Sequence, residues 1–290
     1  MDFLIHLRQD KGLSVSAVKG YSSVLNSVLA LKGVDLASSR EITTLLRSFS
    51  RSVNPVELRP PAWDVSLVLQ SLTEAPYEPL RTCDERFLAQ KTLFLLALAS
   101  AKRIGELHAL SYRVSHSRGW GEVSFCFVPG FVAKTQDPSS LAPRFEGFSV
   151  PALPPTQNRN GRLLCPVRAV RRYLDRTADH RPRCQRLFVT AGRSKKEISK
   201  TTVSFWLRKT ISRAYQLSGT ALPTPAPRAR ETRGIAPSLL FRKNFAVDQV
   251  LKAGTWRRHT TFTRHYLRDI AHRSLDTFHL GPVVAAQALV

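Results

Sequence analysis

Near its carboxyl end the chain reads ARETRG at residues 229–234 and AGTWRRHTTFTRHYLRD at residues 253–269. Basic side chains crowd around one tyrosine, Tyr266, in a segment that also carries other aromatic residues. A phenol is a weak nucleophile near neutral pH, and nearby cations favour its ionised form and stabilise charge on a phosphate under attack. These two runs therefore suit phosphoryl transfer to tyrosine without a metal. A basic surface helix that carries a tyrosine by chance fits them equally well, so the rest of the chain has to decide.

Charge is the strongest signal in the composition. The 290 residues include 44 Lys and Arg against 21 Asp and Glu, a formal net charge of +23. Such an excess predicts a polyanionic partner, most commonly nucleic acid. The charge is spread along the chain rather than set beside one amphipathic segment, and the most apolar run, residues 93–101, is too short to span a bilayer. We therefore expect no membrane partner.

The cysteines and histidines do not form a metal-binding pattern. The four cysteines lack a C-x-x-C pair, so we expect reduced, mostly structural thiols in an intracellular protein. Three histidines recur every seven residues at positions 265, 272 and 279, without an acidic or cysteine partner. That pattern fits a solvated helix face better than a set of ligands. The sequence thus predicts neither a metal nor a cofactor.

The amino-terminal part predicts a small helical module at residues 1–50. Apolar residues predict helices over residues 3–7 and 41–49, and between them a helix capped by Ser14 or Ser16. A module of this size buries too little apolar surface to be stable alone, so it needs a partner surface or DNA.

Residues 51–61 predict a linker, because Asn54-Pro55 and Pro60-Pro61 remove hydrogen-bond donors and favour extended backbone. Residues 62–290 then form a second domain. Its predicted helices cover residues 63–72, 87–98, 166–174, 199–215, 235–244, 247–252 and 261–273. Its predicted strands cover residues 123–128, 131–133 and 148–150, with a turn at Pro129-Gly130. The expected fold class is mainly α with a small antiparallel β-sheet.

Basic residues are densest after residue 165, and few acids balance them. A solvated face is one interpretation, and contact with a phosphate backbone is the other. We assign to DNA contact the side chains of Arg168, Arg171, Arg172, Arg193, Lys195, Lys196, Arg257 and Arg258.

Several separated pieces of the chain follow one another in a characteristic order. Residues 100–107 read SAKRIGEL, and a lysine follows a predicted strand further on. The set consists of Arg103, Glu106, Lys134, Arg233, Trp256 and Tyr266. In order and rough spacing this set resembles the tyrosine recombinase (phage integrase) family, over most of the chain. CPVRA at residues 165–169 and the run from 254 to 266 look closest to the recombinases of DIRS-type retroelements.

The resemblance implies a clamp around duplex DNA, made by a helical, SAM-like core-binding module and a tyrosine recombinase catalytic domain. Tyr266 would be the nucleophile that forms a 3′-phosphotyrosyl link and releases a 5′-hydroxyl. Arg103 and Arg233 would hold the non-bridging phosphate oxygens, for which the planar, always charged guanidinium is suited. Lys134 would protonate the leaving 5′-oxygen, and Glu106 would orient Arg103.

The resemblance also implies that Trp256 packs against the phosphate or donates a hydrogen bond to it. No metal and no nucleotide cofactor is needed. The expected partners are double-stranded DNA and further copies of the chain, as a dimer or tetramer on DNA. Such a protein would be encoded by a mobile element and, in a eukaryotic host, would act in the nucleus.

Two features depart from the family pattern. Arg230 stands where the family usually has histidine, and arginine donates to a phosphate oxygen but does not act as a base for Tyr266. The neighbouring Glu231 is also placed to pair with Arg230 and draw it away. In addition, the module at residues 1–50 is short for a core-binding domain, which indicates a truncated one.

These features leave three functional hypotheses. The first is an active site-specific recombinase, and the second is a catalytically impaired relic that still binds DNA. The third is a general basic helical scaffold for RNA or an acidic protein, which leaves the ordered placement of the site residues unexplained.

Overall fold

The structure is a computed structural model, and it describes residues 1–36, 38–52, 63–133, 147–153, 159–181, 183–192, 194–242, 247–248, 251, 262–263, 266–267 and 287–289. The chain divides into two compact units, Met1–Leu58 and Arg59–Val290. Most of the linker predicted at residues 51–61, namely residues 53–61, lies outside the described residues.

In the described part of the amino-terminal unit the helices are α1 (Asp2–Gln9), α2 (Val15–Ala30) and α3 (Arg40–Arg51). Serine side chains cap the amino-terminal ends of α2 and α3. Ser14 Oγ accepts the Ala17 N–H at 3.2 Å, and Ser39 Oγ accepts the Ile42 N–H at 3.3 Å. Such caps satisfy backbone donors that have no partner inside the helix. The core is small and is built on Leu4, Leu7, Val18 and Phe49.

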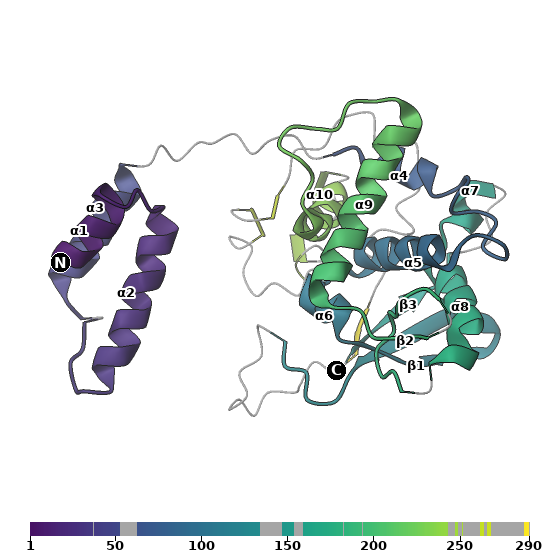
Figure 1. Cartoon of the computed structure of the whole chain (residues 1–290), viewed down its shortest axis with the longest axis horizontal. Coiled ribbons are helices and arrows are strands. Elements are labelled where there is room, and N and C mark those ends of the chain that lie inside the picture. Colours follow the sequence, from purple (N-terminus) through teal and green to yellow (C-terminus); the bar gives the residue numbers. More distant parts are fainter. Residues whose placement is uncertain are drawn as a thin grey trace. The chain divides into compact units, whose positions relative to one another are not determined.

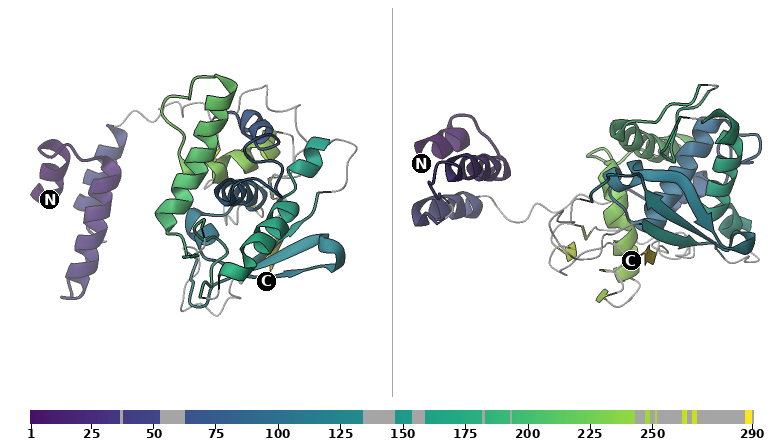
Figure 2. Two further views of the ribbon diagram at one scale, coloured as in Figure 1. Left: turned by 45° about the vertical axis from the view of Figure 1, so that its right-hand side comes forward. Right: turned by 90° about the horizontal axis from the view of Figure 1, so that it is seen from below.

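The second unit is mostly helical and holds one small sheet (Figures 1 and 2). Its helices are α4 (Val65–Ser71), α5 (Glu85–Ser100), α6 (Ile104–His108), α7 (Arg159–Leu163), α8 (Pro166–Thr177), α9 (Lys200–Ser218) and α10 (Thr232–Arg242). Short 3₁₀ turns are η1 (Arg118–Trp120), η2 (Ala178–His180) and η3 (Ala229–Glu231). Its strands are β1 (Leu110–His116), β2 (Glu122–Phe127), β3 (Gly147–Pro151) and β4 (Gln287–Leu289), antiparallel and in that order across the sheet.

Helix α5 lies at the centre of this unit. Asp84 caps its first turn by accepting the Arg86 N–H at 2.7 Å, and the side chains from residue 88 to residue 100 are all buried. A helix that is apolar nearly all round has to be covered on every side. Helices α8, α9 and α10 and strand β3 supply that cover (Figure 1).

The sheet differs from the predicted one in its first strand. The prediction of a strand at residues 131–133 is wrong, and β2 pairs instead with β1, for which no strand was predicted. After β2, the Val128 N–H still donates to the Ala109 carbonyl at 2.8 Å, and the turn at Gly130, with φ of 78°, then leads the chain out of the sheet. The outer half of β1 is largely exposed and polar, so its sequence lacks the apolar alternation of a half-buried strand.

The expected fold class, mainly α with a small antiparallel sheet, is confirmed. The predicted helices over residues 87–98, 166–174 and 199–215 correspond to α5, α8 and α9. The helix predicted at residues 235–244 begins earlier, at Thr232, and so includes Arg233. Within the described part of the chain, no helix is both long and apolar enough to pass through a membrane.

Candidate functional site

The turn between α5 and α6 presents the first site residue. Helix α5 ends at Ala101, which adopts a left-handed conformation with φ of 49°, and its N–H donates to the Ala97 carbonyl at 3.0 Å. After this abrupt end of α5 the chain enters α6 almost at once, and Arg103 is the N-cap of α6. The sequence prediction that Arg103 lies just past the end of a core helix is confirmed.

Glu106 joins two arginines that are 130 positions apart in sequence. Its Oε1 accepts Nη1 of Arg103 at 2.8 Å, and its Oε2 accepts the Arg103 backbone N–H at 2.8 Å. The same Oε2 lies 3.5 Å from Nη1 of Arg233. The Arg103 side chain remains 22% exposed, whereas those of Arg233 and Glu106 are nearly buried. One carboxylate therefore fixes both guanidinium groups while leaving one of them open to solvent.

Arg233 also bonds to the end of the central helix. Its Nη1 donates to the Ala101 carbonyl at 3.1 Å, where the helix dipole favours a cation. Burial lowers the pKa of Arg233, as does the neighbouring Arg103, while Glu106 and Tyr266 act in the opposite direction. Arginine remains protonated despite this lowering of its pKa, because the ordinary pKa of a guanidinium is very high. The site therefore keeps a buried positive charge.

Tyr266 lies against this buried cation. The Cζ atom of Arg233 is 5.4 Å from the centroid of the Tyr266 ring, which is cation–π distance. The tyrosine backbone is held because its N–H donates to the Phe262 carbonyl at 2.8 Å, and the Phe262 side chain is fully buried. Three separated parts of the chain thus bring two guanidinium groups and one phenol together. They are the α5–α6 turn, α10, and the described residues 262–263 and 266–267.

Two supporting residues were missed in the sequence. Phe262 anchors the turn before Tyr266, and Ser238 Oγ lies 3.5 Å from the Tyr266 carbonyl. The signal for Phe262 was available, because it lies four residues before Tyr266 in a predicted helix. Ser238 could not be identified from the sequence, because only the fold brings it close to its hydrogen-bond partner, the Tyr266 carbonyl.

Lys102 is a third cation of this region, and it was not among the site residues predicted from the sequence. Its side chain is buried, and its Nζ lies 5.3 Å from the centroid of the Phe148 ring in β3. Burial lowers the pKa of Lys102 to about 8, with Glu106 opposing this shift and Arg233 and Arg103 adding to it. The site therefore includes a lysine whose proton is held less firmly than usual.

Arg230 is exposed on η3, the short turn before α10. The expected pairing of Glu231 with Arg230 is not what the described contacts show. The Glu231 carboxylate instead accepts the Arg228 backbone N–H at 3.0 Å and so caps the turn. Glu231 thus serves the start of α10 and leaves the Arg230 side chain in solvent.

Five of the predicted site residues lie outside the described residues: Lys134, Trp256, Arg193, Arg257 and Arg258. The site described above consequently contains Arg103, Glu106, Arg233 and Tyr266 of the predicted catalytic set, with Arg230 nearby in sequence.

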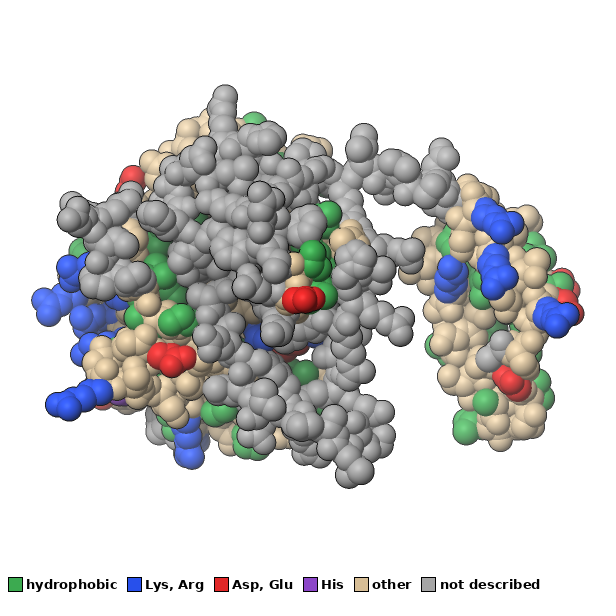
Figure 3. Space-filling model, turned by 180° about the vertical axis from the view of Figure 1, so that it is seen from behind, with side chains coloured by type: hydrophobic (Ala, Val, Ile, Leu, Met, Phe, Trp, Pro, Cys, Tyr) green, Lys and Arg blue, Asp and Glu red, His purple; other side chains and the backbone are tan. Residues whose placement is uncertain are grey.

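The predicted DNA-contacting residues on and after α8 fall into two groups. Arg171 and Lys196 are exposed, and Lys and Arg side chains gather at the edge of the unit that carries α8 (Figure 3). By contrast, Lys195 is buried and pairs with Glu85, and Arg168 donates to both oxygens of Glu78, at 2.7 and 3.0 Å.

These internal pairs contradict the prediction that Lys195 contacts DNA. They leave only part of the Arg168 side chain available for such a contact. The Lys195 side chain is 1% exposed, so a phosphate would reach it only if its pair with Glu85 broke. The Arg168 side chain remains 31% exposed. Arg172 lies 3.9 Å from Asp175, a weak surface pair that leaves it available to a ligand.

No protein-family model and no curated protein matches the chain. Several solved structures do match, and one, described as "Crystal structure of XerA recombinase", has a TM-score of 0.46 and 12% sequence identity, with 94% of each chain covered. A likeness at this level carries no conclusion about activity, so the chemistry depends on the residues described above.

Proposed function

We propose that this protein is a tyrosine recombinase that cleaves and rejoins DNA strands through a 3′-phosphotyrosyl intermediate. One observation carries the proposal: Arg233 lies 5.4 Å from the Tyr266 ring, while Glu106 holds Arg233 and Arg103 side by side. Two fixed guanidinium groups beside a phenol match the charge that develops when a phenolic oxygen attacks a phosphodiester.

In the proposed reaction, the Tyr266 oxygen attacks the scissile phosphorus and gives its proton to a water molecule. The bond from phosphorus to the 5′-oxygen breaks, and the 5′-oxygen takes up a proton from Lys134. Arg103 and Arg233 neutralise the non-bridging oxygens as negative charge grows on them. The phosphotyrosyl bond conserves the energy of the broken phosphodiester, so attack by a 5′-hydroxyl reverses the steps and rejoins a strand.

The proposal extends to partners and origin. The excess of positive charge suits double-stranded DNA, and recombination of two sites needs several protomers, as a dimer or tetramer. The motifs at residues 165–169 and 254–266 support an origin in a DIRS-type mobile element. In a eukaryotic host the protein would then act in the nucleus.

A second candidate is a DNA-binding relic of such an enzyme. Arg230 favours it, because an exposed arginine replaces the histidine that would assist deprotonation of Tyr266. A relic still binds duplex DNA, with an affinity that falls steeply as salt rises, but it does not cleave.

The test uses a pool of nicked duplexes whose sequence around the nick is randomised. Cleavage next to the nick releases a short fragment that diffuses away, which traps the covalent complex. An active enzyme gives a protein–DNA adduct that survives denaturation and is lost in Tyr266→Phe. Absence of any adduct, or an unchanged adduct with Tyr266→Phe, would overturn the proposal.

Arg230→His separates the two candidates. Histidine restores a base, so we expect adduct formation to rise by roughly a hundredfold, the lower end of the range for general base catalysis. The matched control is Arg228→His, two positions away on the same loop. If the chain is inert, and neither it nor Arg230→His forms an adduct while both bind duplex, the relic is the correct interpretation.

A further inference from the structure

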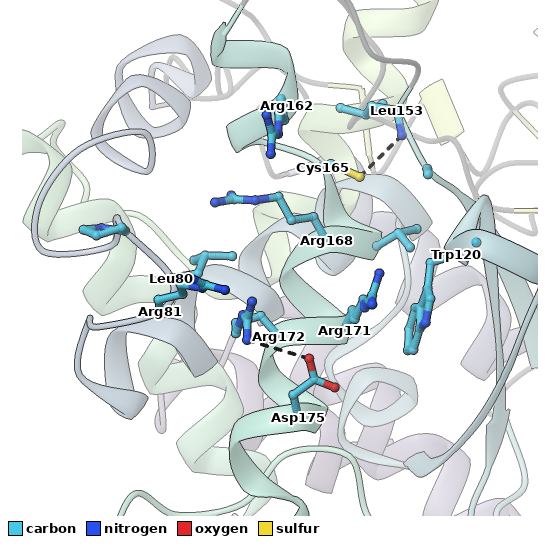
Figure 4. A pocket seen from close by; sticks show the side chains of 14 residues that line it. Leu80, Arg81, Trp120, Leu153, Arg162, Cys165, Arg168, Arg171, Arg172 and Asp175 are labelled. Carbon is cyan, nitrogen blue, oxygen red and sulfur yellow. Dashed lines mark hydrogen bonds and ion pairs between the residues drawn. The ribbon is translucent and has the colours of Figure 1, made fainter.

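A second basic site lies away from the catalytic cluster. A cavity of about 810 Å³ opens between α8, η1 and the loop that precedes α5 (Figure 4). Residues 79–81 of its wall come just before α5 begins, whereas Arg103 follows its end, and a helix of 16 residues is about 24 Å long. The cavity and the catalytic residues are therefore at opposite ends of the central helix.

Arginines are the most frequent residue type among the described residues that line this cavity. They come from three segments, and Figure 4 shows them arrayed around one space. They are Arg81, Arg162, Arg168, Arg171 and Arg172. Asp175 is the acid among the lining residues, and its pair with Arg172 is long at 3.9 Å. The cavity therefore has a strong excess of positive charge.

Several of these guanidinium groups are already positioned for a ligand. Arg171 lies with its Cζ 5.6 Å from the centroid of the Trp120 ring, and Trp120 itself stacks on His116 at 4.1 Å. Arg168 is fixed by Glu78. Arg81 and Arg162 are exposed, and neither has a carboxylate partner among the described residues. Some donors are thus held in place and others are free to close on an anion.

Apolar residues also line the cavity. Trp120, Ala152 and Leu153 are partly exposed there, whereas Leu80 and Val167 are buried, and the Leu153 N–H is occupied by Cys165 Sγ at 3.4 Å. Apolar surface beside these cations does not suit a bare phosphate chain, which has no apolar group to bury. It suits a ligand that carries an apolar side chain between negative groups.

We propose that this cavity binds an acidic peptide segment of a partner protein, with one apolar side chain inserted between two or more carboxylates. Carboxylates match the planar guanidinium fork and bind it bidentately. Duplex DNA fits less well, because a wide convex rod does not place its phosphates inside a concave cavity. A second copy of this chain is also disfavoured, since it carries 44 basic against 21 acidic residues.

Fluorescence anisotropy of the full chain tests this directly. The probe is a fluorescein-labelled peptide in which pairs of glutamates flank a leucine. Two matched peptides replace the leucine by serine or every glutamate by glutamine. We expect saturable binding of the first peptide, and weaker binding of both others by about tenfold or more, since each loses one class of contact.

Variants locate the binding. Arg162→Ala with Arg171→Ala removes two exposed charges from the cavity, and we expect binding of the glutamate–leucine peptide to weaken by at least about tenfold. Arg208→Ala with Lys209→Ala removes the same charge from the exposed face of α9 and should change it by less than about twofold. Leu153→Ser tests the apolar part of the lining and should abolish the preference for leucine over serine.

Competitors identify the source of the anion. An unlabelled peptide should displace the probe, while inorganic phosphate and a duplex oligonucleotide should not do so at matched ionic strength. Displacement by the oligonucleotide that depends on Arg162 and Arg171 would overturn the proposal in favour of a nucleic-acid site. Equal loss of peptide binding in the cavity and α9 variants would contradict the proposal, because it would show that the peptide is held only by nonspecific charge attraction. Neither outcome depends on whether Tyr266 cleaves DNA.

Discussion

Glu106 is the residue on which the geometry of the site depends. It holds Arg103 through two contacts and Arg233 through one, so three positive side chains, with Lys102 among them, lie around a single negative charge. The carboxylate offsets their mutual repulsion, which would otherwise separate the guanidinium groups. The pair of Arg103 and Arg233 is therefore stabilised as part of a larger ionic cluster.

We expect Glu106→Gln to lower the free energy of unfolding by about 2 to 3 kcal/mol, because it leaves a nearly buried Arg233 beside other cations without their counter-charge. Urea denaturation at neutral pH measures this. Glu74→Gln, at an exposed position of the same unit, is the control and should have little effect. Equal stabilities of the two variants would show that Glu106 does not offset the cluster.

Lys102 predicts a pH-dependent stability. Its pKa is about 8 in the folded chain against 10.5 for an ordinary lysine, so below pH 8 folding has to bury a charged group. Between pH 8 and 10.5 the unfolded chain binds more protons than the folded one, and stability therefore rises with pH in this window. We expect Lys102→Met to be more stable than the parent chain by about 3 kcal/mol below pH 8, from a shift of about 2.5 units.

The measurement is the difference in unfolding free energy between Lys102→Met and the parent chain at several pH values. It should shrink as the pH rises from 8 toward 10.5, whereas groups common to both proteins cancel. Lys209→Met, on the exposed face of α9, should show no such trend. A pH-independent difference would mean that Lys102 keeps its proton throughout.

At the scale of elements, two glycines close to the site have opposite roles. A methyl group on Gly147 in β3 would lie 1.8 Å from the Phe125 carbonyl oxygen of β2, so the two strands approach as closely as they do only because residue 147 has no side chain. A methyl group on Gly105 in α6 would meet Lys200 Cε at 3.7 Å, an ordinary contact.

We expect Gly147→Ala to destabilise the second unit by about 2 kcal/mol or more, because the strands have to separate. Gly105→Ala should stabilise it by about 0.5 to 1 kcal/mol, because alanine favours a helix. Thermal unfolding of both variants compares them within one domain. A stable Gly147→Ala would mean that β2 and β3 are not paired in the register described.

These elements also show how far the sequence could be read. Helices α5, α8 and α9 were predicted correctly because the pattern of their apolar residues is local in the sequence. Strand β1 was missed because half of it faces solvent and its apolar pattern is weak. Lys195 was assigned to DNA because its partner Glu85 is 110 residues away, and only the fold brings the two together.

The site itself was only partly predictable. Arg103, Glu106, Arg233 and Tyr266 were found by their order along the chain, and their contacts give that order a geometric meaning. Lys102 was passed over since a lysine beside an arginine looks solvated, and only the packing of β3 against the end of α5 buries it.

At the scale of the whole molecule, charge is used in more than one way. The net charge of +23 suits a nucleic-acid partner, yet several arginines and lysines pair internally, and others line a separate cavity. The proposed catalytic residues and that cavity lie toward opposite ends of α5.

The central claim is that Tyr266 forms a covalent bond with the 3′ end of a cleaved strand. After trapping on the nicked duplex pool, nuclease and trypsin digestion followed by mass spectrometry gives the modified peptide. The account predicts a nucleotide on the peptide HYLR, residues 265–268, through a 3′-phosphate. A nucleotide on any other peptide, or attachment through a 5′-phosphate, would contradict it.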